Sequence, residues 1–203
     1  MLGISTWRGP LRALFAAPAC AALVSCGGGD AGPAPSAGAA ANSPASAPVG
    51  GATTATASTC NLPNFQASLL ARINQVRASG ADCGSDGTFG AAAPVAWNDR
   101  LTAAADAHAE DMSAQNYFSH TSADGRTLAE RVNATGYAWT GLGENIAAGY
   151  PSVNAVMDGW IASPGHCANL MNAVFAEVGV ACVPGAAGDT YSTYWTMDLG
   201  RPR

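Results

Sequence analysis

The stretch Gly141-Leu142-Gly143-Glu144-Asn145-Ile146-Ala147-Ala148-Gly149 decides the fold of this chain. One carboxylate and one amide interrupt an otherwise apolar run, and glycines in such a run mark places where backbone passes close to other groups. We therefore expect a strand or an extended turn here, with Glu144 held against the fold. A glutamate in this position either accepts hydrogen bonds from its surroundings or belongs to a functional site.

Helical patterns surround this stretch. Apolar residues recur at helical spacing from Phe65 to Arg77, and Asn98 is a suitable N-cap for a helix that runs to about Asn116. Val153 to Ala162 predicts another helix. Between them, Thr127 and Glu130 fit a capping box, which gives Glu130 a structural role at a helix start.

The C-terminal part alternates apolar and polar residues in two runs, Val174 to Cys182 and Tyr191 to Leu199. A glycine-rich turn, Gly185 to Gly188, lies between the runs and predicts two antiparallel strands. Helices followed by a strand pair indicate an α+β sandwich.

The chain has three histidines. His108 lies on the apolar face of the helix after Asn98, and we expect a core residue with a satisfied ring nitrogen there. His120 follows the same helix. His166 lies in the first turn of a short helix that begins Ser163-Pro164, where the partial positive charge of the helix start favours a neutral imidazole.

His120, Glu144 and His166 are the candidate functional residues. Two imidazoles and one carboxylate match the ligands of a catalytic zinc site with an open position. They also provide an acid and a base for a hydrolase that acts on a peptide or a wall polymer. A third possibility is a hydrogen-bonded structural core without further activity.

The first residues predict export. Arg8 precedes an apolar stretch, Leu11 to Val24, and Arg12 lies at its start. The stretch is too short to span a bilayer and predicts a signal peptide over residues 1–25. Leu23-Val24-Ser25-Cys26 resembles the lipobox of bacterial lipoproteins, which implies lipidation of Cys26 and anchoring to the outer membrane. An ordinary signal, with a periplasmic or secreted product, is the alternative.

Residues 26–59 form a linker of Gly, Ala, Pro, Ser and Thr that cannot bury a core, so we expect one domain over residues 60–203. The formal net charge is −5, and the chain contains no lysine. Nucleic acid is therefore a poor candidate partner. The expected partners are the membrane, through Cys26, and an unidentified small-molecule, lipid or protein ligand.

The domain retains an even number of cysteines, as expected in an oxidising compartment. Sequence alone allows three pairings. We predict Cys60–Cys83 and Cys167–Cys182, because each closes a short loop worth about 3 kcal/mol in the chain-entropy model. A four-cysteine zinc site is the alternative, although no Cys-x-x-Cys spacing occurs.

The residues resemble the CAP superfamily, which includes cysteine-rich secretory proteins, venom antigen 5 proteins and plant pathogenesis-related proteins. The resemblance covers nearly all of residues 60–203 and points to the bacterial branch. It rests on Ala107-His108-Ala109-Glu110-Asp111-Met112, Tyr117-Phe118-Ser119-His120, Gly143-Glu144-Asn145-Ile146-Ala147, Trp160, Ser163-Pro164-Gly165-His166 and Asn169-Leu170-Met171.

The resemblance implies a three-layer α-β-α sandwich with a central antiparallel sheet and a cavity lined by two histidines and two glutamates. His120, Glu144 and His166 match three of these four. The second glutamate is missing, since the corresponding stretch, residues 160–163, has no carboxylate. The implied function is a cell-envelope binding module whose cavity holds a ligand or a divalent ion such as zinc, with an extracellular hydrolase as the alternative.

Overall fold

The structure, a computed structural model, describes residues 57–203. The predicted signal peptide, the lipidation site at Cys26 and nearly all of the predicted linker lie outside the described residues. No helix within 57–203 is long and apolar enough to cross a membrane.

A four-stranded sheet runs through the middle of the fold, in the order β3-β5-β6-β4. Strands β4, β6 and β5 pair antiparallel, while the short β3 pairs parallel with β5. The central sheet is therefore antiparallel except at one edge. The strands are β3 (Ala96–Trp97), β4 (Trp139–Ala148), β5 (Glu177–Pro184) and β6 (Thr193–Pro202).

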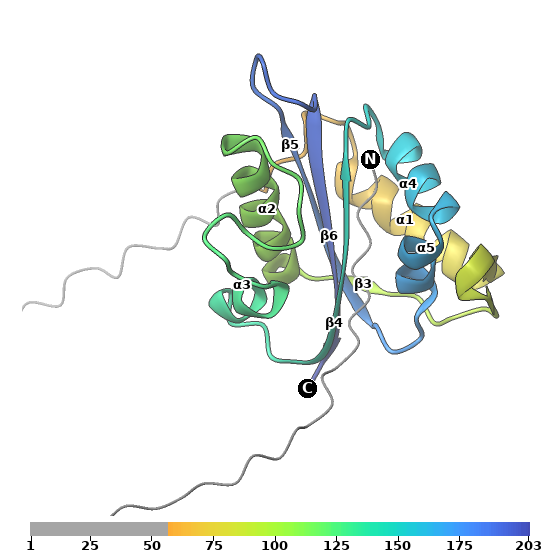
Figure 1. The fold of residues 1–203 in the computed structure, drawn as a ribbon. Coiled ribbons are helices and arrows are strands. Elements are labelled where there is room, and N and C mark those ends of the chain that lie inside the picture. Colours follow the sequence, from red (N-terminus) through yellow and green to blue (C-terminus); the bar gives the residue numbers. More distant parts are fainter. Residues whose placement is uncertain (1–56) are drawn as a thin grey trace, which may run out of the picture. The chain divides into compact units, whose positions relative to one another are not determined.

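Helices cover both faces of the sheet. One layer contains α2 (Asp99–Ala114) and α3 (Leu128–Ala134), as Figure 1 shows. The other contains α1 (Phe65–Ser79), α4 (Val153–Ala162) and α5 (Pro164–Met171). This arrangement confirms the predicted α+β fold with three α-β-α layers.

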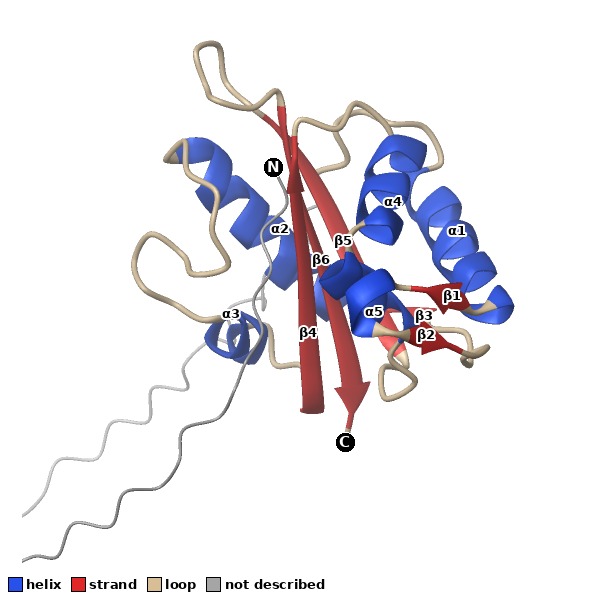
Figure 2. Ribbon diagram, turned by 45° about the vertical axis from the view of Figure 1, so that its right-hand side comes forward, coloured by secondary structure: helices blue, strands red, loops and turns tan. Residues whose placement is uncertain are grey.

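A small two-stranded sheet lies next to α5 (Figure 2). Its strands are β1 (Ala81–Asp82) and β2 (Thr88–Phe89), which pair antiparallel around a 3-10 turn, Gly84–Asp86.

The two faces of the sheet bury different side chains, because successive residues of a strand point to opposite sides. On β6, Trp195, Met197 and Leu199 pack in the main core with α1 and α4. Trp195 stacks on Phe65 with ring centroids 5.7 Å apart. The intervening residues of β6 point towards α2, and Tyr194 packs there against Met112.

Local signals place the helix starts where the sequence predicts them. The Asn98 side chain accepts hydrogen bonds from the backbone N–H groups of Arg100 and Leu101, at 2.9 and 3.3 Å, and so caps α2. The capping box of Thr127 and Glu130 is present at α3. Ser163 stands at the N-cap position of α5, but its side chain makes no capping hydrogen bond.

The predicted disulfides are wrong. The structure joins Cys60 to Cys182 and Cys83 to Cys167, across sequence separations of 122 and 84 residues. Residues 58–60 lie alongside β5, where the Cys60 N–H donates to the Cys182 carbonyl at 2.9 Å. Loop entropy grows only slowly with length, so the preference for short loops was a weak guide and tertiary neighbours decide the pairing.

Candidate functional site

His120 and Glu144 are in direct contact. Glu144 lies on β4 and points towards α2 and α3, and His120 lies in the loop between these two helices. The His120 Nδ1 is 2.7 Å from Glu144 Oε1, with the Glu144 side chain 3% exposed and the imidazole 21% exposed. Because a carboxylate only accepts, Nδ1 is assigned the proton of this bond, and Nε2 is the basic nitrogen of the neutral ring.

Arg131 on α3 holds the other carboxylate oxygen. Its Nη2 donates to Glu144 Oε2 in a buried ion pair. Its Nη1 donates to the carbonyls of His120 and Arg126, both at 3.1 Å, and to Ser122 Oγ at 3.2 Å. One guanidinium therefore fixes the loop that carries His120 and the glutamate that orients it.

Burial by itself raises the pKa of Glu144, since it disfavours the charged form. The hydrogen bond from His120 and the positive charge of Arg131 oppose this effect and hold the pKa below its ordinary value. Glu144 is consequently an anion at neutral pH.

His108 is a core residue, as predicted. It is fully buried, and its Nε2 donates to the Ser119 carbonyl at 2.9 Å, while Ser122 Oγ lies 3.5 Å from Nδ1. Burial lowers the pKa of His108, so the ring is neutral at pH 7. Its role is to support the loop behind His120.

Asp198 is a buried acid at this site that the sequence analysis missed. It lies on β6 directly opposite Glu144 and is fully buried. Burial, and then the negative charge of Glu144, raise the pKa of Asp198 well above its usual range. A charged residue inside the apolar run before Leu199 was the available signal. Arg131 was missed because no apolar pattern in its short helix indicates that the arginine side chain points towards the interior.

His166 lies in the other layer, on the opposite face of the sheet from the Glu144 side chain. It is buried in the first turn of α5, and its carbonyl accepts a hydrogen bond from Asn145 Nδ2 at 3.1 Å. Asn145 also accepts a hydrogen bond from Asn169 Nδ2 at 2.9 Å. Glu144 and Asn145 are adjacent in β4, so their side chains point to opposite faces, with α5 on the Asn145 side.

The arrangement does not fit the predicted metal site of His120, Glu144 and His166. Within residues 57–203, no three His, Cys, Asp or Glu side chains are grouped so that they could hold a metal ion. Both oxygens of Glu144 already accept hydrogen bonds, one from a guanidinium that would repel a cation. The disulfides likewise remove the alternative four-cysteine zinc site.

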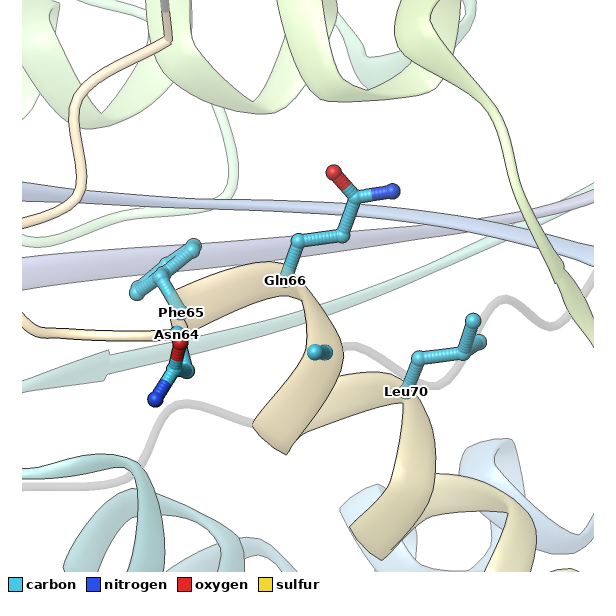
Figure 3. A pocket seen from close by; sticks show the side chains of 5 residues that line it. Asn64, Phe65, Gln66 and Leu70 are labelled. Carbon is cyan, nitrogen blue, oxygen red and sulfur yellow. The ribbon is translucent and has the colours of Figure 1, made fainter.

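Two surface hollows lie elsewhere. One, of about 460 Å³, is at the first turns of α1, where Figure 3 shows Phe65, Gln66 and Leu70 among its lining residues. The other, of about 450 Å³, lies near Arg100, Tyr137 and Arg203. Neither includes a residue of the His120–Glu144 pair, so the polar cluster and these hollows are separate features.

Comparison with known proteins agrees with the fold. A model of the cysteine-rich secretory protein (CAP) family matches residues 70–199, well over half of the chain. An uncharacterized membrane protein of Bacillus subtilis, YlbC, is 35% identical over 88 residues, which is 43% of this chain and 25% of the relative. The match thus spans about a quarter of that protein.

Two solved structures share the fold at low identity. An outer surface protein of Borrelia burgdorferi has a TM-score of 0.55 and 18% identity, over 66% of this chain and 90% of its own. A cysteine-rich secretory protein of Staphylococcus aureus has a TM-score of 0.51 and 17% identity, over 70% and 39%.

Proposed function

Because this chain belongs to the cysteine-rich secretory protein family, we propose that it is an exported, envelope-anchored module that binds a polar ligand through the His120 imidazole. The observation that carries the proposal is the 2.7 Å contact between His120 and a buried, anionic Glu144. This contact orients the ring, whose exposed edge would face a polar ligand that carries hydroxyl or amide donors. Such donors are abundant on glycans and peptides of a cell wall.

The partial exposure of His120 supports this role. At 21% exposed, the imidazole is accessible to a ligand, whereas Glu144 and Arg131 behind it are closed to solvent. The buried ion pair holds the accessible ring in one orientation before any ligand binds. The ring therefore loses little conformational freedom on binding.

Adding a ligand while following the imidazole signals tests the proposal. With three histidines in the chain, nuclear magnetic resonance resolves each ring. We expect disaccharide-peptide fragments of peptidoglycan to shift the His120 signals of the Cys26→Ser chain, and His120→Ala to weaken binding at least tenfold. Gln66→Ala, in the hollow beside α1, is the matched control and should bind normally. Ligand-induced shifts of the remaining signals that persist in His120→Ala would place binding elsewhere and refute the proposal.

The second part of the proposal is the anchor. Residues 1–25 would be a lipoprotein signal, Cys26 would carry the lipid, and the linker would extend to residue 59. The two disulfides fit an exported protein. We expect the chain to fractionate with membranes and to incorporate a labelled fatty acid, and Cys26→Ser to abolish both. A Cys26→Ser chain that stays in the membrane fraction would contradict the anchor.

A hydrolase is the second candidate, and one observation favours it. A histidine whose Nδ1–H is bonded to a carboxylate is the arrangement that enzymes use to orient a general base. In this reaction the His120 imidazole would take a proton from the water molecule that attacks a peptide or wall polymer. The hydrolase is supported if wild type releases product from peptidoglycan or peptide substrates and His120→Gln, with the same melting temperature, does not. Equal release by both proteins would exclude it.

A further inference from the structure

Glu144 is held from three directions, and the third contact has no counterpart in the predicted trio. His120 occupies Oε1, and Arg131 occupies Oε2. On β6, Asp198 stands opposite Glu144 in the strand register. Because paired residues of neighbouring strands project from the same face, the two carboxyl groups lie side by side on one face of the sheet.

The surroundings of Asp198 provide little to stabilise a negative charge. On β5 its neighbour in the register is Gly179, which has no side chain, and α2 packs so closely there that a Cβ on Gly179 would overlap the Thr102 backbone. No donor within residues 57–203 bonds to either oxygen of Asp198. A fully buried carboxylate without donors is strongly unfavourable, and the protonated acid avoids that cost.

The charged and titratable groups facing Asp198 lead to the same conclusion. Glu144 on β4 is an anion and repels a second one. Arg131 on α3 attracts an anion, but it donates hydrogen bonds to Glu144 and to the His120 loop. Its effect on Asp198 is weaker than those of burial and of the Glu144 charge. His108 on α2 is neutral. A proton shared between the two carboxyls balances the charges, leaving one anion beside one guanidinium.

We propose that Asp198 is a positioning residue of the His120 site, which stays protonated at neutral pH and donates a hydrogen bond to Glu144. This bond completes the set of donors on the glutamate, so that its carboxylate keeps the orientation that His120 requires. The inference deepens the proposed function and rests on it for its biological meaning. The protonation of Asp198 is measurable without any ligand.

Two substitutions separate the roles of Asp198 in the full chain carrying Cys26→Ser. Asp198→Asn keeps a neutral side chain that can donate, whereas Asp198→Leu removes the donor at similar volume. Wild type should show an infrared band of a protonated carboxyl at pH 7, where exposed carboxyls are ionised, and both variants should lose it. Absence of the band in wild type would overturn the proposal.

The His120 ring reports on positioning. We expect the midpoint pH of the His120 signals to be the same in wild type and Asp198→Asn, within about 0.2 unit, because no charge is removed. An ionised Asp198 would instead lower the midpoint in Asp198→Asn by about one unit. Asp198→Leu should alter the Nδ1–H signal and the midpoint, and an unchanged ring would refute positioning. Failure of ligand binding in wild type would refute the proposed function alone.

Discussion

At the residue scale, Glu144 is the centre of the site, and its partners differ in how far the sequence could predict them. His120 and Glu144 stand in recognisable motifs, so their pairing could be anticipated. Asp198 reaches Glu144 only through the register of β4 with β6, which joins residues far apart in the chain. Arg131 reaches it through the packing of a short helix. Such contacts depend on tertiary structure, and no local pattern encodes them.

The pH dependence of stability should reveal Asp198. Its pKa is raised in the folded protein, so above about pH 4 the unfolded chain loses this proton while the folded chain keeps it. The free energy of unfolding of wild type should therefore fall, relative to Asp198→Asn, by about 1.4 kcal/mol for each pH unit up to the folded pKa. Urea unfolding of both proteins between pH 4 and 7 measures the difference. A constant difference would mean that Asp198 ionises normally.

Arg77 is a second buried arginine, and its role is structural. Its guanidinium donates to the carbonyls of Ala93, Leu170, Asn172 and Phe175, at 2.7 to 3.1 Å, and so joins α1 to the end of α5. Arg77→Leu would leave these carbonyls without donors and should lower the free energy of unfolding by about 3 kcal/mol or more. Arg72→Leu, on the exposed side of α1, should change it by less than about 1 kcal/mol. Chemical denaturation compares the two.

At the element scale, the helices and the two long C-terminal strands follow their sequence signals closely. The N-cap of α2, the capping box of α3 and the proline start of α5 are local devices, so the sequence locates them. The partner of each strand and the parallel pairing of β3 are not local. The Asn145 link between β4 and α5 belongs to this second kind.

Removing the Asn145 side chain should loosen α5. Asn145 is fully buried, donates to the His166 carbonyl and accepts from Asn169. Asn145→Ala should lower the free energy of unfolding by about 1–3 kcal/mol, because buried groups lose their partners. Asn133→Ala, which removes an exposed hydrogen bond to Trp139, is the matched control and should cost less. Equal losses would show that the α5 contact contributes nothing special.

At the scale of the whole molecule, the disulfides connect regions that the sequence could not bring together. Cys60–Cys182 ties the start of the domain to β5, and Cys83–Cys167 ties the small sheet to α5. The N-terminal segment predicted export, and the composition of the rest predicted a linker followed by a single compact domain with an even number of cysteines. It could not predict the pairing, because that depends on how the layers stack.

Peptide mapping without reduction should recover the pairs Cys60–Cys182 and Cys83–Cys167, and no peptide joining Cys60 to Cys83. Each bridge closes a long loop, so its removal should destabilise the fold by about 4–5 kcal/mol in the chain-entropy model. Cys60→Ala with Cys182→Ala, measured by thermal unfolding, tests the magnitude. An unchanged melting temperature would contradict it.

The position of Cys60–Cys182 has a mechanical consequence. A pull on the chain from its N-terminal side enters the described structure at residues 57–60, and there it meets a covalent link to β5 before it reaches α1. The load is passed to a strand that is hydrogen-bonded on both sides, where many bonds share it. If the chain is anchored at Cys26 as proposed, a pull from the envelope would reach β5 before it reaches the first helix, and the His120 loop does not lie between residues 57–60 and β5.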